Sequence, residues 1–446
     1  MTDTTVRPDQ QPAEQPHRLA WEILERIRYI DSTHPPVYRH PTNSALDIEW
    51  EPLSFAYGDL GACLSLAAAD ALRPDDGWDV VAHRHLVRAV ERYRPLTALG
   101  PGIFTGVGGL AFCLRSLSRD GTRYGEAIRS VENEVFSRGR ALIDRCTAGS
   151  GLAPSDYDVI SGLAGMVGYI MSSTAQEQPR LFGLADSAIA ALADTALETA
   201  DIGGFWTPGA QVSEFEAGNL PGLWAGYLNL GFAHGIAGVV SVLGQALDRG
   251  MGGSRVRPAV TKLADLLLAS ATTAEPRDVP YHLSWHEHHS HGVAESARSN
   301  PGLSRFAWCY GNPGTALALS NSESTRREYA DEIGPLFEPG ARSVDQLDID
   351  NPSLCHGYAG LMLIDKWIGE AIPSATDGTV GDFALQALLG LIDRSQPLLV
   401  RNAQQGHPQI DSPGFLDGSG GAAVALLAIT GADEPVGLRA LSGRWT

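Results

Sequence analysis

The chain has 446 residues, and its 33 lysines and arginines stand against 52 aspartates and glutamates, for a formal net charge of −19. Hydrophobic residues make up 43% of the sequence and charged residues 19%, a composition that suits a large packed core and argues against global disorder. The acidic balance disfavours nucleic acid and anionic membrane surfaces as main partners, whereas a cationic peptide would be attracted.

The N-terminal residues 1–17 are polar and rich in proline and glutamine, and we expect a flexible tail there, followed by a single domain over residues 18–446. The tail contains no apolar stretch that would serve as a signal peptide. No run of about 18 apolar residues occurs, so no transmembrane segment is expected. The five cysteines are an odd number spread thinly along the chain, which is typical of a reducing compartment. We therefore expect a cytoplasmic protein.

Glycine carries the first specific pattern. The chain has 50 glycines, about 11% of its residues against roughly 7% on average. Fourteen of them form seven copies of one unit, which is Gly-x-x-Gly followed by an apolar segment. The copies lie at residues 58–61 (GDLG), 106–109 (GVGG), 162–165 (GLAG), 235–238 (GIAG), 311–314 (GNPG), 357–360 (GYAG) and 418–421 (GSGG).

The segment after each glycine motif is apolar on nearly all sides, which indicates a helix buried on all sides. Longer amphipathic stretches lie between the motifs, for example residues 123–145, and their three- and four-residue spacing indicates outer helices with one wet face. Repeats of this length predict an array of helix pairs. Because no terminal repeat is clearly polar, we predict an all-α protein folded as a closed α/α toroid, with seven inner and seven outer helices. The glycines would supply the positive φ and close backbone approach that its turns need.

Two segments interrupt this rhythm, near residues 203–231 and 273–301. Both contain turn residues and aromatic residues and show little helical periodicity. We interpret them as insertions of loops or short strands over one mouth of the ring, where loops commonly carry specificity.

Ionisable residues recur just before the glycine motifs. If every motif opens an inner helix, the residues that precede it lie at the same end of the ring in each repeat, however far apart they are in the sequence. The symmetry would therefore gather one group of side chains at one mouth. Its members are Asp158, His234, Cys309, Cys355, His356 and Asp417.

Two thiols and an imidazole at one mouth suit Zn²⁺, and three protein ligands with an open fourth position are typical of a catalytic zinc. The alternative is that Cys309 and Cys355 are buried small hydrophobes, the commoner fate of an intracellular cysteine. His234 alone would be a core or capping histidine, and Asp158 a helix cap. Asp417 is interpreted as a cap or as a residue that supports a ligand.

A second histidine-rich run spans residues 282–291. His286 and Glu287 begin a sequence like the HExxH motif of zinc proteases, but that motif needs histidine at 290, where Ser290 stands. We interpret the run as a solvated loop and assign it no metal.

The sequence resembles the lanthionine synthetase C-like family, the cyclases of lanthipeptide biosynthesis. The matching motifs are YDVISGLAG, FAHGIAG, SRFAWCYGNPG, LCHGYAG and GFLDGSGG, in this order between residues 157 and 421. The resemblance implies an α/α toroid of the stand-alone cyclase type that binds a single zinc ion through Cys309, Cys355 and His356. It also implies functional roles for Asp158, His234, Arg305 and Tyr310. Asp417 is a departure, since the family often has glutamate there.

The chemistry that this resemblance implies is the closure of thioether rings. A peptide cysteine at the open zinc position would become a thiolate and add to the β-carbon of a dehydroalanine or dehydrobutyrine. His234 would protonate the resulting enolate, with Asp158 orienting it, and Arg305 would stabilise the enolate or hold Asp158. The implied partners are a dehydrated precursor peptide with its leader and a complex of dehydratase and exporter, which would place the protein at the membrane periphery.

Three other functions would each explain part of this pattern. A zinc- and thiol-binding scaffold of the same family, holding glutathione or a partner protein, would have no need of the acid that His234 offers. A toroidal glycosidase would need two carboxylates, for which only Asp158 and Asp417 stand at the mouth, and would leave the cysteines unexplained. A zinc prenyltransferase would need a basic diphosphate site, for which the motifs supply only Arg305.

Overall fold

The computed structural model describes residues 14–30, 50–93, 99–148, 151–173, 178–198, 204–212, 221–272, 276–298, 302–340, 342–403, 410, 412–431 and 434–445. This part of the chain is mostly helical, with one small antiparallel sheet. None of its helices combines the length and the hydropathy needed to cross a bilayer. Helix α1 (Glu14–Arg28) already covers the last four residues of the predicted tail, whose residues 1–13 lie outside the described part.

A buried helix begins at each glycine motif, as predicted. In each of these helices most side chains are inaccessible to solvent, because the helix is enclosed on all sides. Within the described residues the seven inner helices are α2 (Asp59–Leu72), α4 (Val107–Ser116), α7 (Leu163–Met171), α10 (Ile236–Asp248), α14 (Gly311–Ser320), α16 (Tyr358–Ala371) and α18 (Ser419–Ile429).

Seven amphipathic helices pack around the inner ones. In α5 the buried residues Ile128, Val131, Val135 and Leu142 recur at helical spacing, so one face meets the core and the other meets water. Among the described residues the outer helices are α1, α3 (Trp78–Tyr93), α5 (Gly125–Thr147), α8 (Pro179–Ala196), α11 (Val256–Ser270), α15 (Glu323–Phe337) and α17 (Thr379–Gly390).

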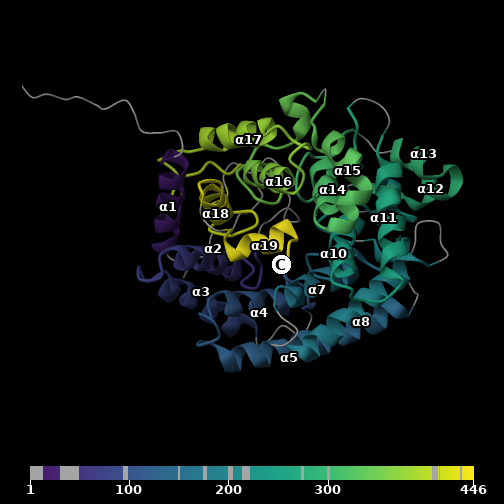
Figure 1. The fold of residues 1–446 in the computed structure, drawn as a ribbon. Coiled ribbons are helices and arrows are strands. Elements are labelled where there is room, and N and C mark those ends of the chain that lie inside the picture. Colours follow the sequence, from purple (N-terminus) through teal and green to yellow (C-terminus); the bar gives the residue numbers. More distant parts are fainter. Residues whose placement is uncertain are drawn as a thin grey trace, which may run out of the picture.

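The helix pairs close into a ring (Figure 1). Each inner helix contacts the outer helix that follows it in the sequence, and α1 packs on α18. Each inner helix also contacts the next inner helix, and α18 contacts α2, so the first and last repeats are neighbours. The predicted α/α toroid of seven inner and seven outer helices is confirmed.

A ring of main-chain hydrogen bonds joins the segments that enter the inner helices. In each repeat a main-chain N–H of this segment donates to a carbonyl oxygen of the next repeat, and the seventh repeat donates to the first. The bonds are Phe55 to Phe104 (3.0 Å), Phe104 to Ile160 (3.0 Å), Val159 to Ala233 (3.3 Å), Phe232 to Cys309 (3.0 Å), Cys309 to Cys355 (3.1 Å), Leu354 to Leu416 (3.0 Å) and Leu416 to Phe55 (2.9 Å).

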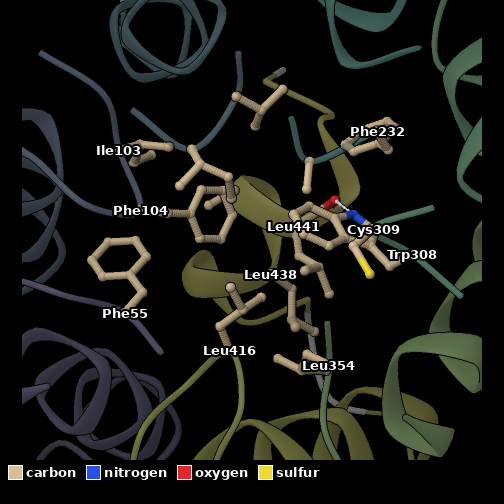
Figure 2. Close-up of a cluster of buried hydrophobic side chains, with 14 of the residues drawn as sticks. Phe55, Ile103, Phe104, Phe232, Trp308, Cys309, Leu354, Leu416, Leu438 and Leu441 are labelled. Carbon is tan, nitrogen blue, oxygen red and sulfur yellow. Dashed lines mark hydrogen bonds between the residues drawn. The ribbon is translucent and has the colours of Figure 1, made fainter. Parts of the chain in front are cut away.

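Large apolar side chains fill the centre of this ring. The residue three positions before each motif is buried and apolar in every repeat, as Phe55, Phe232 and Trp308 illustrate. Figure 2 shows these side chains around Leu438 and Leu441 of the short helix α19 (Val436–Ser442). The indole Nε1–H of Trp308 donates to the Leu441 carbonyl oxygen over 2.8 Å, so the C-terminal segment fills the lumen beneath the mouth.

The second glycine of each motif is required by close packing. A Cβ at Gly238 would lie 2.3 Å from the carbonyl oxygen of Phe232, and one at Gly360 would lie 2.0 Å from that of Leu354. Each inner helix therefore starts directly against the main chain that precedes it. The positive φ expected at these glycines is wrong for the motif in general, because among its fourteen glycines only Gly311 has one, at 79°.

The two predicted insertions meet in one sheet. Strands β1 (Thr207–Pro208), β2 (Gly226–Asn229) and β3 (His282–Ser284) are antiparallel in the order β1-β2-β3. The further short elements are α6 (Pro154–Tyr157), η2 (Gly209–Gln211), η3 (Pro221–Leu223), α12 (Trp285–His291), α13 (Val293–Arg298) and η4 (Val344–Leu347). Residues 203, 213–220, 273–275 and 299–301 of the insertions lie outside the described residues, and the division into domains stays a prediction.

The prediction of a loop for the histidine-rich run is wrong, whereas the predicted exposure to solvent holds for His286, His289 and His291. His282 is buried in β3, and the run from His286 to His291 lies on α12, where His288 is buried as well. The ring of Trp285 packs against His289 with 5.3 Å between centroids and against Trp206 with 4.0 Å. Aromatic packing at the junction of the two insertions therefore orders this segment, a contact that local periodicity does not reveal.

Candidate metal centre

One position in each repeat faces the mouth of the ring. It is the residue directly before the first glycine of the motif, two residues after the buried apolar position. Most of these residues are partly exposed, whereas the apolar position is buried. The seven residues are Tyr57, Thr105, Ser161, His234, Tyr310, His356 and Asp417.

Cys309, Cys355 and His356 form one compact group at this mouth. Their two sulfurs and one imidazole nitrogen all lie within 4.8 Å of one another. The main-chain N–H of Cys309 donates to the Cys355 carbonyl oxygen, so the hydrogen-bonded ring itself places the fifth repeat against the sixth. The main-chain N–H of His356 donates to Ser353 Oγ over 3.1 Å, which fixes the turn that carries two of the three side chains.

The two thiols have pKa values shifted in opposite directions. A hydrogen bond from the Cys355 thiol and a second one from His356 hold the pKa of Cys309 well below its ordinary value, against the effect of burial. The same bond to Cys309, together with burial, raises the pKa of Cys355. Burial acts to lower the pKa of His356, but Asp417 and Cys309 outweigh it and raise this pKa. The group thus stabilises a thiolate inside the protein.

Asp417 and Tyr57 border the group on the side of the seventh and first repeats. Oδ1 of Asp417 lies 3.6 Å from Nδ1 of His356, and burial raises the pKa of this carboxyl. Burial also raises the pKa of Tyr57, helped by the negative charges of Asp417 and Cys355, so its phenol stays neutral. The interpretation of Asp417 as a residue that supports a ligand agrees with its place beside His356.

His234 and Asp158 form a second group in the neighbouring repeats. Nδ1 of His234 lies 2.7 Å from Oδ2 of Asp158. Oδ1 of the same carboxylate accepts hydrogen bonds from the main-chain N–H groups of Ser161 (2.7 Å) and Gly162 (2.8 Å), at the start of α7. Asp158 therefore serves both as a helix cap and as the partner of His234. Its side chain is 1% exposed, whereas that of His234 is 44% exposed at the mouth.

Main-chain contacts join the two groups. The N–H groups of Phe232 and Ala233, directly before His234, both donate to the carbonyl oxygen of Cys309, at 3.0 and 3.2 Å. Tyr310 follows Cys309, and its hydroxyl accepts a hydrogen bond from Asn229 Nδ2 over 3.1 Å. Burial raises the pKa of Tyr310, so its hydroxyl remains protonated between the two groups.

Arg305 is oriented differently from expectation. Its Nε–H donates to Oδ2 of Asp348 over 3.0 Å, and its main-chain N–H donates to Tyr281 Oη over 2.9 Å. Asp158 is held instead by His234 and by main-chain N–H groups. The expectation that Arg305 holds Asp158 therefore finds no contact among the described residues.

The donor set fits zinc. Two cysteine sulfurs and one histidine nitrogen are ligands that Zn²⁺ prefers, and atoms at about 2.0–2.3 Å from a tetrahedral ion lie about 3–4 Å apart. The observed span of at most 4.8 Å needs only a small contraction to reach that geometry. Among the described residues no other group of three or more His, Cys, Asp or Glu side chains could hold a metal, and the histidine-rich run forms none.

Comparison with known proteins identifies the family. A sequence model of the family described as lanthionine synthetase C-like protein matches residues 49–439. The chain belongs to the lanthionine synthetase C-like family. It is 26% identical over 288 residues to the nisin biosynthesis protein NisC of Lactococcus lactis subsp. lactis, a match that covers 63% of this chain and 64% of that protein, somewhat under two thirds of its length. The solved structure of nisin cyclase has the same fold, with a TM-score of 0.72, 20% identity and 96% of each chain covered.

The sequence alone missed four residues of this lanthionine synthetase C-like centre. Tyr57 could have been found, because it stands directly before the first glycine motif, as His234 and Tyr310 stand before theirs. Asn229, Tyr281 and Asp348 carry no such signal. They lie in the insertions or in the loop after η4, and only the folded chain brings them to Tyr310 and Arg305.

Proposed function

We propose that the protein is a zinc-dependent lanthipeptide cyclase that forms lanthionine and methyllanthionine rings. The observation that carries the proposal is the Cys309–Cys355–His356 group at the mouth, next to the His234–Asp158 pair. Membership in the lanthionine synthetase C-like family supports it, as does the likeness to the nisin biosynthesis protein. One zinc ion per chain would be held by the two cysteines and His356.

Zinc in this group would bind the thiol of a peptide cysteine and lower its pKa, so that the sulfur is a thiolate at neutral pH. The reaction adds the elements of S–H across the carbon–carbon double bond of a dehydroalanine or dehydrobutyrine. The sulfur forms a bond to Cβ, the electron pair of the double bond moves towards the neighbouring carbonyl oxygen, and the resulting enolate takes a proton at Cα. No oxidant or further reactant is needed.

His234 is the general acid of the proposal, and Asp158 orients it. Because Nδ1 is occupied by Asp158, proton transfer to Cα would take place at Nε2. The buried carboxylate stabilises the protonated imidazole before transfer and fixes the plane of the ring. Its own position is fixed by the N–H groups of Ser161 and Gly162, so His234 is held on a rigid support.

Arg305 and Tyr310 would stabilise the negative charge that develops on the carbonyl oxygen. Both lie beside Cys309, one four residues before it and one directly after it. Arg305 offers a permanent positive charge and Tyr310 a neutral hydroxyl donor. Donors placed before the reaction at the oxygen that becomes negative lower the barrier more than the same groups would in water.

The substrate would be a dehydrated precursor peptide with its leader, and the acidic charge balance disfavours nucleic acid as a partner. The net charge of −19 would attract a cationic peptide and accelerate its association. We further propose that the protein acts in the cytoplasm and joins a dehydratase and an exporter at the membrane periphery.

A peptide assay separates this function from that of a thiol-binding scaffold, for example one that holds glutathione. A synthetic peptide with one dehydroalanine and one cysteine is incubated with zinc-loaded protein, and free thiols are counted by alkylation and mass spectrometry. A cyclase removes the thiol without changing the peptide mass, and His234→Ala abolishes this while retaining zinc. A scaffold would bind the peptide or glutathione with the thiol intact, and its binding would not depend on His234.

A further inference from the structure

We propose that Asp348 is a positioning residue that holds the guanidinium of Arg305 at the metal centre in the orientation needed to receive the developing enolate. The inference rests on the proposed function, because it assigns a task within that reaction. Asp348 lies outside all the glycine motifs, in the loop between α15 and α16.

Arg305 is held by one edge of its side chain. Its Nε–H is bound to Asp348 Oδ2, and its main-chain N–H is bound to Tyr281 Oη. Among the described residues neither terminal nitrogen, Nη1 or Nη2, has a hydrogen-bond acceptor. A guanidinium anchored through Nε presents these remaining donors as a planar fork, the arrangement that suits an oxygen carrying negative charge.

The charge of Arg305 reaches the whole centre. It acts on both cysteine thiols, Cys309 and Cys355, and on His356 and Asp417. With its side chain only 18% exposed, Arg305 acts through a medium that screens charge less than bulk water does. Because Arg305 lies on the segment that carries Cys309, four residues before it, the orientation of its guanidinium bears on the group that would bind the substrate thiol.

The loop that carries Asp348 is fixed to the segment that carries Arg305. The N–H of Phe306, next to Arg305, donates to the carbonyl oxygen of Leu347, next to Asp348, over 2.9 Å. Asp348 itself has a left-handed backbone conformation with φ 52° and ψ 42°, at the end of η4. A β-carbon disfavours this region, in which aspartate and asparagine are tolerated better than most residues. The backbone thus aims this carboxylate at Arg305.

Stability gives little reason for this pair. The Asp348 side chain is 58% exposed, and an ion pair of this kind contributes little to the free energy of unfolding. A role in orienting Arg305 explains why the ion pair is present at the edge of the centre although Asp348 has a disfavoured backbone conformation. Such a role predicts a loss of catalytic rate without a loss of fold.

The test compares Asp348→Gly, Asp348→Asn, Arg305→Gln and the double variant Asp348→Gly/Arg305→Gln. Glycine removes the carboxylate and relieves the left-handed backbone, whereas asparagine keeps an acceptor and the same backbone preference. Asp345→Asn is the matched control, because it removes an equal charge from the same exposed loop. Cyclisation kinetics of a dehydrated peptide are combined with the NMR signal of the Arg305 Nε–H group, which reports the hydrogen bond without any reaction.

We expect Asp348→Gly to lower kcat about tenfold with KM almost unchanged. The Arg305 Nε–H signal should lose its protection from exchange, and Asp348→Asn should lie between this variant and the wild type. In the Arg305→Gln background the glycine substitution should have no further effect, and Asp345→Asn should behave as the wild type. Full kcat in Asp348→Gly, or losses that multiply in the double variant, would overturn the inference.

The NMR measurement also separates the two hypotheses. If the wild-type protein does not cyclise the peptide, the proposed function fails. A protected Arg305 Nε–H signal that disappears in Asp348→Gly would then still establish the positioning contact. A signal that persists in Asp348→Gly would refute the contact itself, whatever the activity.

Discussion

Nδ1 of His234 lies 2.7 Å from Oδ2 of Asp158, although 76 residues separate them in the sequence. The two residues belong to neighbouring repeats, and the main-chain hydrogen bond from Val159 to Ala233 holds these repeats together. Asp158 is fixed further by the start of α7. The pair therefore depends on the packing of neighbouring repeats in the ring. The group of Cys309, Cys355 and His356 depends on it as well, because the main-chain hydrogen bond from Cys309 to Cys355 joins the fifth and sixth repeats.

Asp158→Asn tests the His234–Asp158 pair. Without the carboxylate the protonated imidazole loses its stabilisation and its orientation, so we expect kcat to fall by about 10²- to 10⁴-fold. The zinc content should stay the same, because Asp158 is not a ligand. Because the two residues act as a unit, Asp158→Asn combined with His234→Ala should be no slower than His234→Ala alone. Independent, multiplying losses would contradict the pairing.

Cys309→Ala and Cys355→Ala test the ligand set. Each removes one of three protein ligands, so we expect both variants to lose bound zinc while they retain the helical circular dichroism spectrum of the wild type. Cys146→Ala, on the outer helix α5, is the matched control and should keep one zinc per chain. Zinc content is measured on tag-free protein. Retention of stoichiometric zinc in either of the first two variants would exclude the proposed ligands.

Asp417→Asn tests the support of His356. A carboxylate beside a metal-bound imidazole orients the ring, and its removal typically lowers metal affinity 10- to 100-fold. With Asp417 Oδ1 at 3.6 Å from His356 Nδ1, we expect a loss near the lower end of this range, about tenfold. Competition with a chelator measures the dissociation constant. An unchanged affinity would leave Asp417 the role of a cap alone.

Gly238→Ala tests the close approach that the glycine motif permits. The new methyl group would lie 2.3 Å from the Phe232 carbonyl oxygen, so we expect the free energy of unfolding to fall by about 1–3 kcal/mol. Gly183→Ala, on the outer helix α8, is the control. Nothing lies within 4 Å of its new methyl group, and alanine there should stabilise the helix by about 0.5–1 kcal/mol. Chemical denaturation of both variants checks the opposite signs.

His85 predicts a dependence of stability on pH. This residue of α3 is buried beside Asp59 and Arg88, and burial lowers its pKa below 6.5. Below about pH 6.5 the imidazole of His85 is therefore more protonated in the unfolded chain than in the folded chain. Because the unfolded chain binds more protons, the free energy of unfolding falls as the pH is lowered from 6.5. His85→Gln should lose less stability than the wild type between pH 7.5 and 5.5. Parallel losses in the two proteins would contradict this.

The sequence predicted much of the fold because each repeat carries its own signal. The glycine motif begins every inner helix, and the apolar residue three positions earlier, such as Trp308, turns into the lumen. His234 and His356 were predictable because they stand at the same place in their repeats, and so do Cys309 and Cys355. Asp348 and Asn229 were not, because they belong to the irregular loops that differ between repeats. The prediction of a loop for the histidine-rich run was wrong for a related reason. Trp285 packs on Trp206, which is distant in the sequence, and this contact orders the run.

In the proposed reaction, thioether formation depends on one zinc ion held by Cys309, Cys355 and His356. The most direct test removes metal from the protein with a chelator, adds zinc back in steps and measures the cyclisation rate of a dehydrated peptide at each step. We expect no activity without zinc and a rate that rises linearly to a limit at one equivalent per chain. Cyclisation by the metal-free protein at the same rate, or no cyclisation at any zinc content, would contradict it.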